Sequence, residues 1–213
     1  MAETSNSKLE EVSNAIAFFD NPNLIESPQF PALKSIGKNV AEVGGSWFHV
    51  SLVWQNNGSL TKTASFPALE SADGAFCWFN NDSLVEIGDF PLLQSVSEPG
   101  IIMTGNNALE TVGSFDALAT SGGIDVISNA KLASLPNSPA LKTLGKLIIS
   151  GNDELTSIDG LTTLESVERD FIVRDNPKLP LCGVLALLDQ LDESPGGDVV
   201  TSGNDESDLS CLE

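Results

Sequence analysis

The chain has 213 residues and a formal net charge of −20, with 30 Asp and Glu against 10 Lys and Arg. This excess of negative charge repels phosphate, so nucleic acids and anionic membranes are poor partners. No apolar run reaches the roughly 18 residues that a transmembrane helix needs. One His and three Cys leave little for a zinc site. We therefore expect no cofactor, no metal and no membrane-spanning segment.

The chain is built from repeats that are marked by asparagine. An Asn followed three residues later by Leu recurs at spacings of 36, 24, 25, 23, 23 and 24 residues, and one more Asn follows after 28 residues. A unit of about 24 residues cannot bury its own apolar face, whereas stacked units can. The repeats therefore predict a right-handed parallel β-solenoid of about eight turns over residues 8–180. The repeated residues are Asn21, Asn57, Asn81, Asn106, Asn129, Asn152, Asn176 and Asn204.

A short strand is expected before each of these asparagines. The residues five and three positions before the Asn are apolar, as Phe76 and Trp78 are before Asn81. Positions two apart share one face of a strand, so both columns should face the core. An Asn side chain at the following corner can donate to and accept from the backbone of its own turn and the next. We predict a structural Asn ladder; the alternative is that Asn merely suits turns.

Taken in chain order, residues 1–7 are expected to be disordered or left from cloning, and Leu9 begins partway through a turn. Between the first two turns there is an insertion of about residues 38–50 that contains Gly44 and Gly45. Insertions in repeat proteins map to loops, and such loops often carry binding. The insertion is therefore a candidate binding loop, or else a tolerated bulge or additional β-arm.

The outward face of the strands is the main candidate binding surface. Its positions lie four and two residues before each Asn, where a solvated sheet should be polar. Many of them are apolar instead, which marks an interaction surface if they are exposed. Two alternatives remain: a terminal helix or the 38–50 insertion covers the face, or the residues reflect β-propensity alone. The candidate binding residues are Phe19, Val53, Phe79, Ile102, Ile127, Ile148 and Ile172.

The C-terminal part, residues 181–211, is predicted to cap the solenoid. It begins with helical spacing that places Leu181, Leu185 and Leu188 on one side, followed by a last strand over residues 199–204. Cys182 and Cys211 flank this segment, and a disulfide between them is the favoured pairing. Such a bond indicates an oxidising compartment. Residues 212–213 resemble a cloning scar, and the export signal is expected to have been removed.

Two reactive side chains remain outside these patterns. Cys77 occupies an outward column, where it either joins two chains or stays a shielded free thiol. His49 lies in the insertion without a second His or a Ser/His/Asp arrangement, so we expect a loop residue and no catalysis.

The segment from Leu147 to Ile158, Leu-Ile-Ile-Ser-Gly-Asn-Asp-Glu-Leu-Thr-Ser-Ile, resembles receptor L-domain repeats, which are distant relatives of leucine-rich repeats. The C-terminal Asn-Pro-x-Leu-Pro-x-Cys segment, residues 176–182, is similar to the end of bacterial secreted members. The resemblance covers about residues 8–211 and implies a role in extracellular binding or adhesion. No catalytic residues follow from it, because the family has no common active site.

The leading hypothesis is a non-catalytic, extracellular or cell-surface recognition or adhesion module that binds a protein or a glycan through the apolar sheet face. A second hypothesis is a structural surface-layer protein whose solenoids self-associate. A third is a polysaccharide-active enzyme on a solenoid, which needs clustered carboxylates and bases on one face; the sequence does not place such a cluster.

Overall fold

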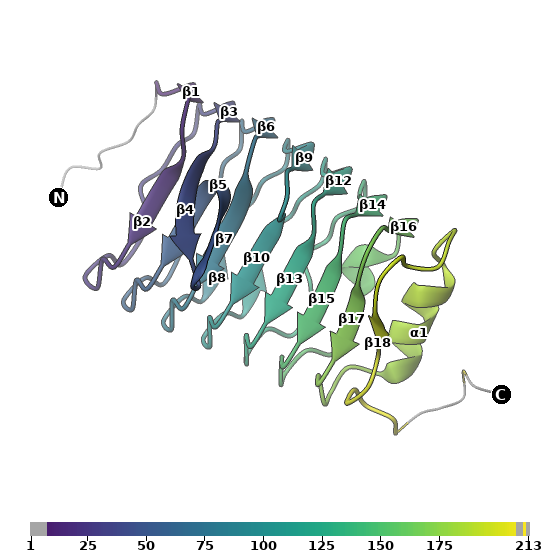
Figure 1. Cartoon of the computed structure of the whole chain (residues 1–213). Coiled ribbons are helices and arrows are strands. Elements are labelled where there is room, and N and C mark those ends of the chain that lie inside the picture. Colours follow the sequence, from purple (N-terminus) through teal and green to yellow (C-terminus); the bar gives the residue numbers. More distant parts are fainter. Residues whose placement is uncertain (1–7, 208–210, 212–213) are drawn as a thin grey trace.

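The structure, a computed structural model, describes residues 8–207 and 211; the predicted N-terminal tail 1–7 and the predicted cloning scar 212–213 lie outside this range. The described chain is a parallel β-solenoid of about eight turns with one short helix near its C-terminal end (Figure 1). Each of the first seven turns contributes one strand to each of two long sheets, and the last turn adds a strand to one of them. The fold class predicted from the repeats is confirmed.

Three sheets run along the solenoid. The main sheet has nine strands, a second sheet has seven, and a third has two. The main sheet consists of β2 (Ile16–Phe19), β4 (Asn39–Val43), β5 (Ser46–Gln55), β7 (Ala75–Phe79), β10 (Ile101–Thr104), β13 (Ile124–Ile127), β15 (Leu147–Ser150), β17 (Phe171–Arg174) and β18 (Val199–Val200). The second sheet consists of β1 (Glu11–Val12), β3 (Ser35–Ile36), β6 (Ser71–Ala72), β9 (Ser95–Val96), β12 (Thr120–Ser121), β14 (Thr143–Leu144) and β16 (Ser166–Val167). The third pairs β8 (Glu86–Ile87) with β11 (Thr111–Val112), and a 3₁₀ turn, η1 (Asp159–Leu161), follows on the same side of the repeat.

One continuous apolar core fills the solenoid. The two inward columns of the main sheet belong to it, and Trp54 stacks on Trp78 with ring centroids 5.4 Å apart. A second aromatic column contains Phe66, Phe90 and Phe115, with centroid separations of 5.2 and 5.1 Å. Equivalent side chains contact each other because the parallel strands pair in register, as Phe76 does with Ile101.

The asparagines form a buried ladder along one corner of the solenoid. Asn106 is fully buried; its Oδ1 accepts from the backbone N–H of Asn81 at 3.1 Å, and its Nδ2 donates to the carbonyl of Trp78 at 3.0 Å. The same contacts recur at Asn129, whose Nδ2 donates to the carbonyl of Met103 at 2.9 Å. Each Asn thus satisfies inward-facing backbone groups that the corner would otherwise leave unpaired.

The residue before each ladder Asn has a left-handed backbone. Its φ is positive in all eight turns, for example +53° at Asp20, +55° at Ser128 and +69° at Gly151. Asn, Asp and Gly tolerate this conformation best, and they occupy seven of the eight positions. The left-handed residue ends the strand and turns the following Asn side chain inward.

Helix α1 (Leu181–Asp189) packs against the last turns of the core. Its buried residues are Val184 and Leu187, and Leu181 and Leu188 pack beside them. Leu185, the third leucine of the spacing that predicted the helix, is partly buried and lies outside this cluster. The Cys182–Cys211 disulfide is formed and ties the helix to the end of the described chain.

Candidate functional site on the outer face of the main sheet

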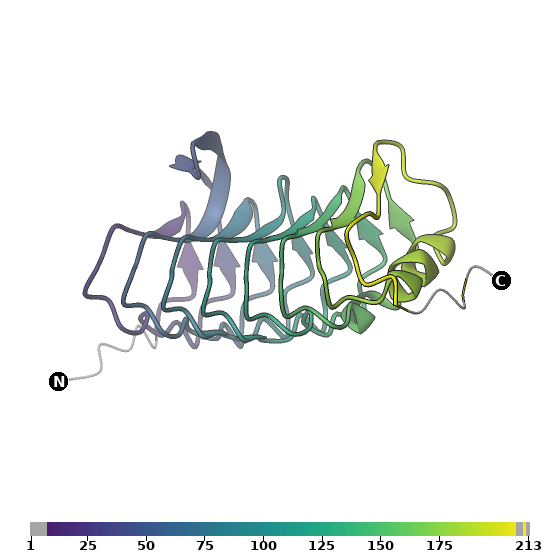
Figure 2. The same ribbon diagram turned by 90° about the horizontal axis from the view of Figure 1, so that it is seen from below.

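The 38–50 insertion is a β-hairpin that rises from the outer face of the main sheet (Figure 2). Strands β4 and β5 pair antiparallel through the two-residue turn Gly44–Gly45, whose φ angles are +58° and +82°. Two positive φ angles are the requirement of a type I′ hairpin turn, which only glycine and a few other residues accept readily. Strand β5 then continues into the main sheet through a bulge between Val50 and Leu52.

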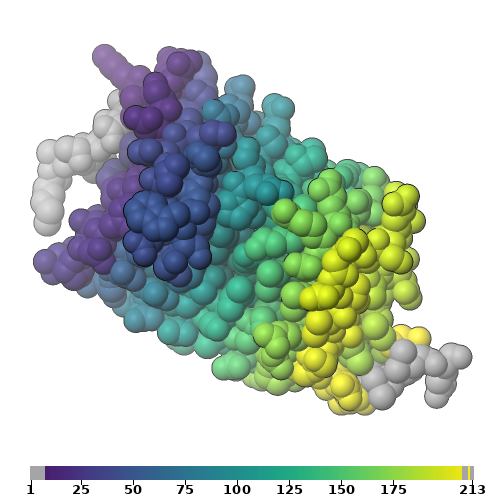
Figure 3. Space-filling model, viewed as in Figure 1, coloured from purple at the N-terminus to yellow at the C-terminus, as the bar shows by residue number. Residues whose placement is uncertain are grey.

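The hairpin lies against the outer face and covers part of it. Its inward side chains, Val43 and Val50, form a second apolar cluster with Val53, Cys77 and Ile102 of the sheet. In the space-filling view, the blue atoms of the hairpin lie in front of this part of the sheet (Figure 3). One alternative predicted for the apolar outer columns was that the 38–50 insertion covers them. This is the case for β5, β7 and the near part of β10.

This cover corrects the exposure expected for two candidate binding residues. Val53 is fully buried and Ile102 is 7% exposed, because the hairpin lies over both. Val53 therefore cannot contact a ligand. The other five candidates remain partly exposed: Phe19, Phe79, Ile127, Ile148 and Ile172.

The tip of the hairpin contacts one of these aromatic rings. A side-chain carbon added at Gly44 would overlap the Phe79 ring, so the glycine backbone itself lies directly on the ring. The Gly44 N–H donates to Oε1 of Gln55 at 3.2 Å. These two contacts fix the tip over β5 and β7.

A groove with a volume of about 350 Å³ runs beside the hairpin. Phe48 of the hairpin and Phe79, Ile102 and Ile127 of the sheet line its apolar part. Its polar side chains include Thr104, Asp125 and Lys146. The groove lies where the covered part of the outer face meets the partly exposed part.

A buried ion pair forms one side of the groove. Asp125 Oδ2 lies 2.7 Å from Lys146 Nζ, and their side chains are 10% and 22% exposed. Burial raises the pKa of the Asp125 carboxyl, while the hydrogen bond and charge of Lys146 and the charge of Arg169 oppose that rise. Within the described chain, the second carboxylate oxygen, Oδ1, is buried and accepts no hydrogen bond. The sequence carried one signal for this residue, a single acidic side chain in an otherwise mostly apolar column.

Arg169 closes the edge of the face next to this pair. Its Nη1 lies 2.9 Å from Glu98 Oε1, and its Nη2 donates to the carbonyl of Gly122 at 3.2 Å. Its Nε donates to the carbonyl of Gly145 at 3.3 Å. The guanidinium thus spans three successive turns and fixes the loops that border Asp125.

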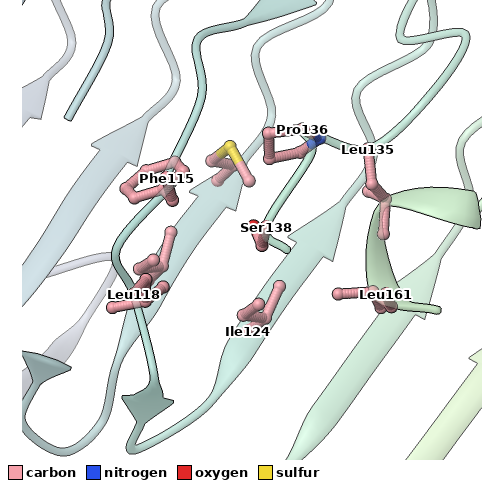
Figure 4. A pocket seen from close by; sticks show the side chains of 9 residues that line it. Phe115, Leu118, Ile124, Leu135, Pro136, Ser138 and Leu161 are labelled. Carbon is pink, nitrogen blue, oxygen red and sulfur yellow. The ribbon is translucent and has the colours of Figure 1, made fainter. Parts of the chain in front are cut away.

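A second, enclosed cavity lies inside the core and is too small for a ligand (Figure 4). Its volume is about 10 Å³, roughly one water molecule. Phe115, Leu135 and Leu161 line it, and Ser138 supplies the one polar side chain among the described residues of the lining. Ser138 stands where the preceding turns place phenylalanine, so the cavity marks the end of the aromatic column.

Cys77 and His49 do not form a reactive pair. Cys77 is buried under the hairpin as a free thiol, and burial raises the pKa of its thiol above the ordinary value. His49 and Trp47 point to the opposite, solvent-exposed side of the hairpin. A buried, protonated thiol is a poor nucleophile.

Comparisons with known proteins leave the chain without an assigned family. No family model matches it, and neither the curated proteins nor the solved structures contain a match. The solenoid is compatible with a solenoid-repeat fold, and the narrower resemblance to receptor L-domains has no further support.

Two classes of feature are absent from the part of the chain that the structure describes. Residues 8–207 and 211 contain no helix long and apolar enough to cross a membrane. The same residues contain no group of three or more His, Cys, Asp or Glu side chains arranged to hold a metal ion.

Proposed function

We propose that this protein is a non-catalytic recognition module that binds its ligand on the outer face of the main sheet, beside the β4–β5 hairpin. The observation that carries the proposal is the groove at the edge of the hairpin, where aromatic and aliphatic side chains surround a buried ion pair. Concave, largely apolar sites with a few placed polar groups are typical of ligand binding.

The setting proposed for this module is extracellular or at a cell surface. The Cys182–Cys211 disulfide supports it, because such bonds persist in oxidising compartments. The receptor L-domain-like repeats, which imply extracellular binding or adhesion, are consistent with the eight-turn solenoid and are part of the same proposal.

The partly exposed side chains beyond the hairpin extend the proposed surface. Ile127, Ile148 and Ile172 lie on three consecutive strands, β13, β15 and β17. The hairpin and the segment around β18 both rise from the solenoid on this side (Figure 2). A ligand larger than the groove would contact these isoleucines between the two projections.

Binding of the purified chain to arrays of extracellular proteins and of glycans tests the proposal. Ile127→Lys places a charge in the groove without reaching the core, so it should abolish binding and leave the melting temperature nearly unchanged. Leu92→Lys is the matched control, since Leu92 is 46% exposed and lies outside the main sheet. Equal binding by parent and Ile127→Lys would contradict the proposed surface.

The second candidate function, self-association into a surface structure, has one observation in its favour. Among the described residues, β2 is an edge strand that pairs only with β5, and its residue Phe18 is only partly buried. Unpaired edges can accept a strand from another chain. Light scattering distinguishes the two functions. A parent chain that stays monomeric at high concentration rules out self-association. A parent chain that forms multimers, with Ile127→Lys forming them equally well, supports self-association over the recognition module.

A further inference from the structure

We propose that the groove beside the hairpin binds a neutral saccharide. This inference rests on the proposed function, because it assigns a chemical class to the ligand of the same site. The volume of about 350 Å³ lies in the range of small-molecule sites, about 300–1,000 Å³. It is sufficient for one or two sugar rings of a longer chain.

The polar side of the groove offers both kinds of hydrogen-bonding partner. Lys146 carries three N–H donors, and one of them points to Asp125 Oδ2, so Asp125 positions the ammonium in the groove. Asp125 Oδ1 itself is shielded from solvent and has no partner among the described residues. The Thr104 hydroxyl both donates and accepts, so neighbouring hydroxyls of one sugar ring can bond it and the remaining N–H groups of Lys146.

The apolar side of the groove fits the other property of a sugar ring. One face of a pyranose presents C–H groups, which pack on aromatic and aliphatic side chains. Phe48 and Phe79 supply two rings on the hairpin side, and Ile127 continues the apolar surface toward Asp125. Flat apolar contact on one side and paired polar groups on the other fix both the position and the orientation of such a ring.

Charge selects a neutral ligand over the charged ones. The net charge of −20 repels an anionic glycan from the protein as a whole. Lys146 already neutralises Asp125 across a 2.7 Å ion pair. A cationic ligand entering the groove would therefore be repelled by the Lys146 ammonium before it could pair with the Asp125 carboxylate. An uncharged polyhydroxyl compound avoids both repulsions.

The test is a glycan array that carries neutral oligosaccharides of glucose, mannose, galactose and N-acetylglucosamine together with sialylated and sulfated glycans. Titration calorimetry then measures affinity for the neutral oligosaccharide that is bound best. We expect Asp125→Asn and Ile127→Ala each to weaken this affinity at least tenfold, and the control Leu92→Ala to leave it unchanged. Ile127→Ala keeps the test decisive if Asp125→Asn does not fold.

Three results would overturn the inference: no retention of neutral glycans by the parent, a preference for acidic glycans, or unchanged affinity in both groove variants. Failure of the saccharide inference is distinguishable from failure of the proposed function. If the parent binds an extracellular protein and Ile127→Lys loses that binding while no glycan is retained, the recognition surface stands and the saccharide does not. If neither array shows binding, both proposals fail.

Discussion

The contact between the hairpin tip and the sheet can be tested with two neighbouring glycines. Gly44 and Gly45 share the type I′ turn and both have positive φ, so alanine strains the backbone at either position. They differ in surroundings: a side-chain carbon at Gly44 meets the Phe79 ring, whereas one at Gly45 meets nothing within 4 Å in the described chain. Gly45→Ala is therefore a matched control for Gly44→Ala.

The expected difference between the two variants follows from that contact. An alanine in the left-handed region costs about 1–2 kcal/mol, and this cost is common to both. Gly44→Ala must also displace the tip from Phe79, and inserting a methyl group into a packed contact costs typically about 1–3 kcal/mol. At about 1.4 kcal/mol per tenfold, the hairpin should open roughly 5- to 150-fold more often in Gly44→Ala than in Gly45→Ala.

Cys77 supplies the assay, because the hairpin covers its thiol and the other described cysteines are joined in the disulfide. Under native conditions a thiol reagent labels Cys77 at a rate proportional to the fraction of molecules with an open hairpin, as long as the hairpin recloses faster than the reagent reacts. Labelling should be faster in Gly44→Ala by the ratio above, and low concentrations of urea should hardly accelerate it, because opening of the hairpin exposes little surface. Equal labelling rates would refute the docked tip, and labelling that rises with urea as steeply as unfolding does would assign the exposure to global unfolding instead.

Three other predictions concern stability. Asn129→Ala should destabilise the chain by about 2–5 kcal/mol in urea titrations, because it leaves two buried backbone groups of the preceding turn, the Asn106 N–H and the Met103 carbonyl, without this partner. Asn21→Ala, at the exposed end of the ladder, should cost less than about 1 kcal/mol. Ser138→Val should fill the enclosed cavity and raise stability by about 1 kcal/mol, and a loss would show that the cavity cannot accept a methyl group. Burial raises the pKa of the Asp125 carboxyl in the folded state, so its ionisation favours unfolding as the pH rises from about 4. The melting temperature of the parent should therefore fall relative to that of Asp125→Asn between about pH 4 and pH 7. A difference in melting temperature that stays constant over this range would contradict the raised pKa.

The repeat could be predicted from the sequence because its physical signals are local and recur at one period. A column of Asn, such as Asn106 and Asn129, needs only the strand end before it and the next turn beside it. The inward columns follow from the two-residue period of a strand. The left-handed residue before each Asn was an additional signal, since Asn, Asp or Gly stands there in seven turns, and sequence reasoning missed it.

The state of the outer face could not be predicted in the same way. Periodicity shows which side of a strand a residue occupies, but not whether another segment lies on that side. Val53 and Ile102 have the same pattern as Ile127 and Ile148, yet the hairpin covers only the first two. A weak signal was present in the insertion itself, where Phe48 and Val50 alternate with Trp47 and His49, as expected of a strand with one covered face.

The length of the hairpin explains why the candidate site lies where it does. Five paired residues on each arm carry the cover from β5 to the edge of β10, and the next strand along the sheet presents Asp125 in the same outward column. Only about a tenth of the Asp125 side chain stays exposed beside the hairpin, so the carboxylate is largely desolvated and depends on its ion pair with Lys146. A hairpin that stops short leaves Asp125 at the boundary, where apolar walls meet an unsatisfied polar atom. Asp125 is the only charged residue in this outward column among the described turns, and the hairpin ends one strand before it. The groove therefore forms where the hairpin stops.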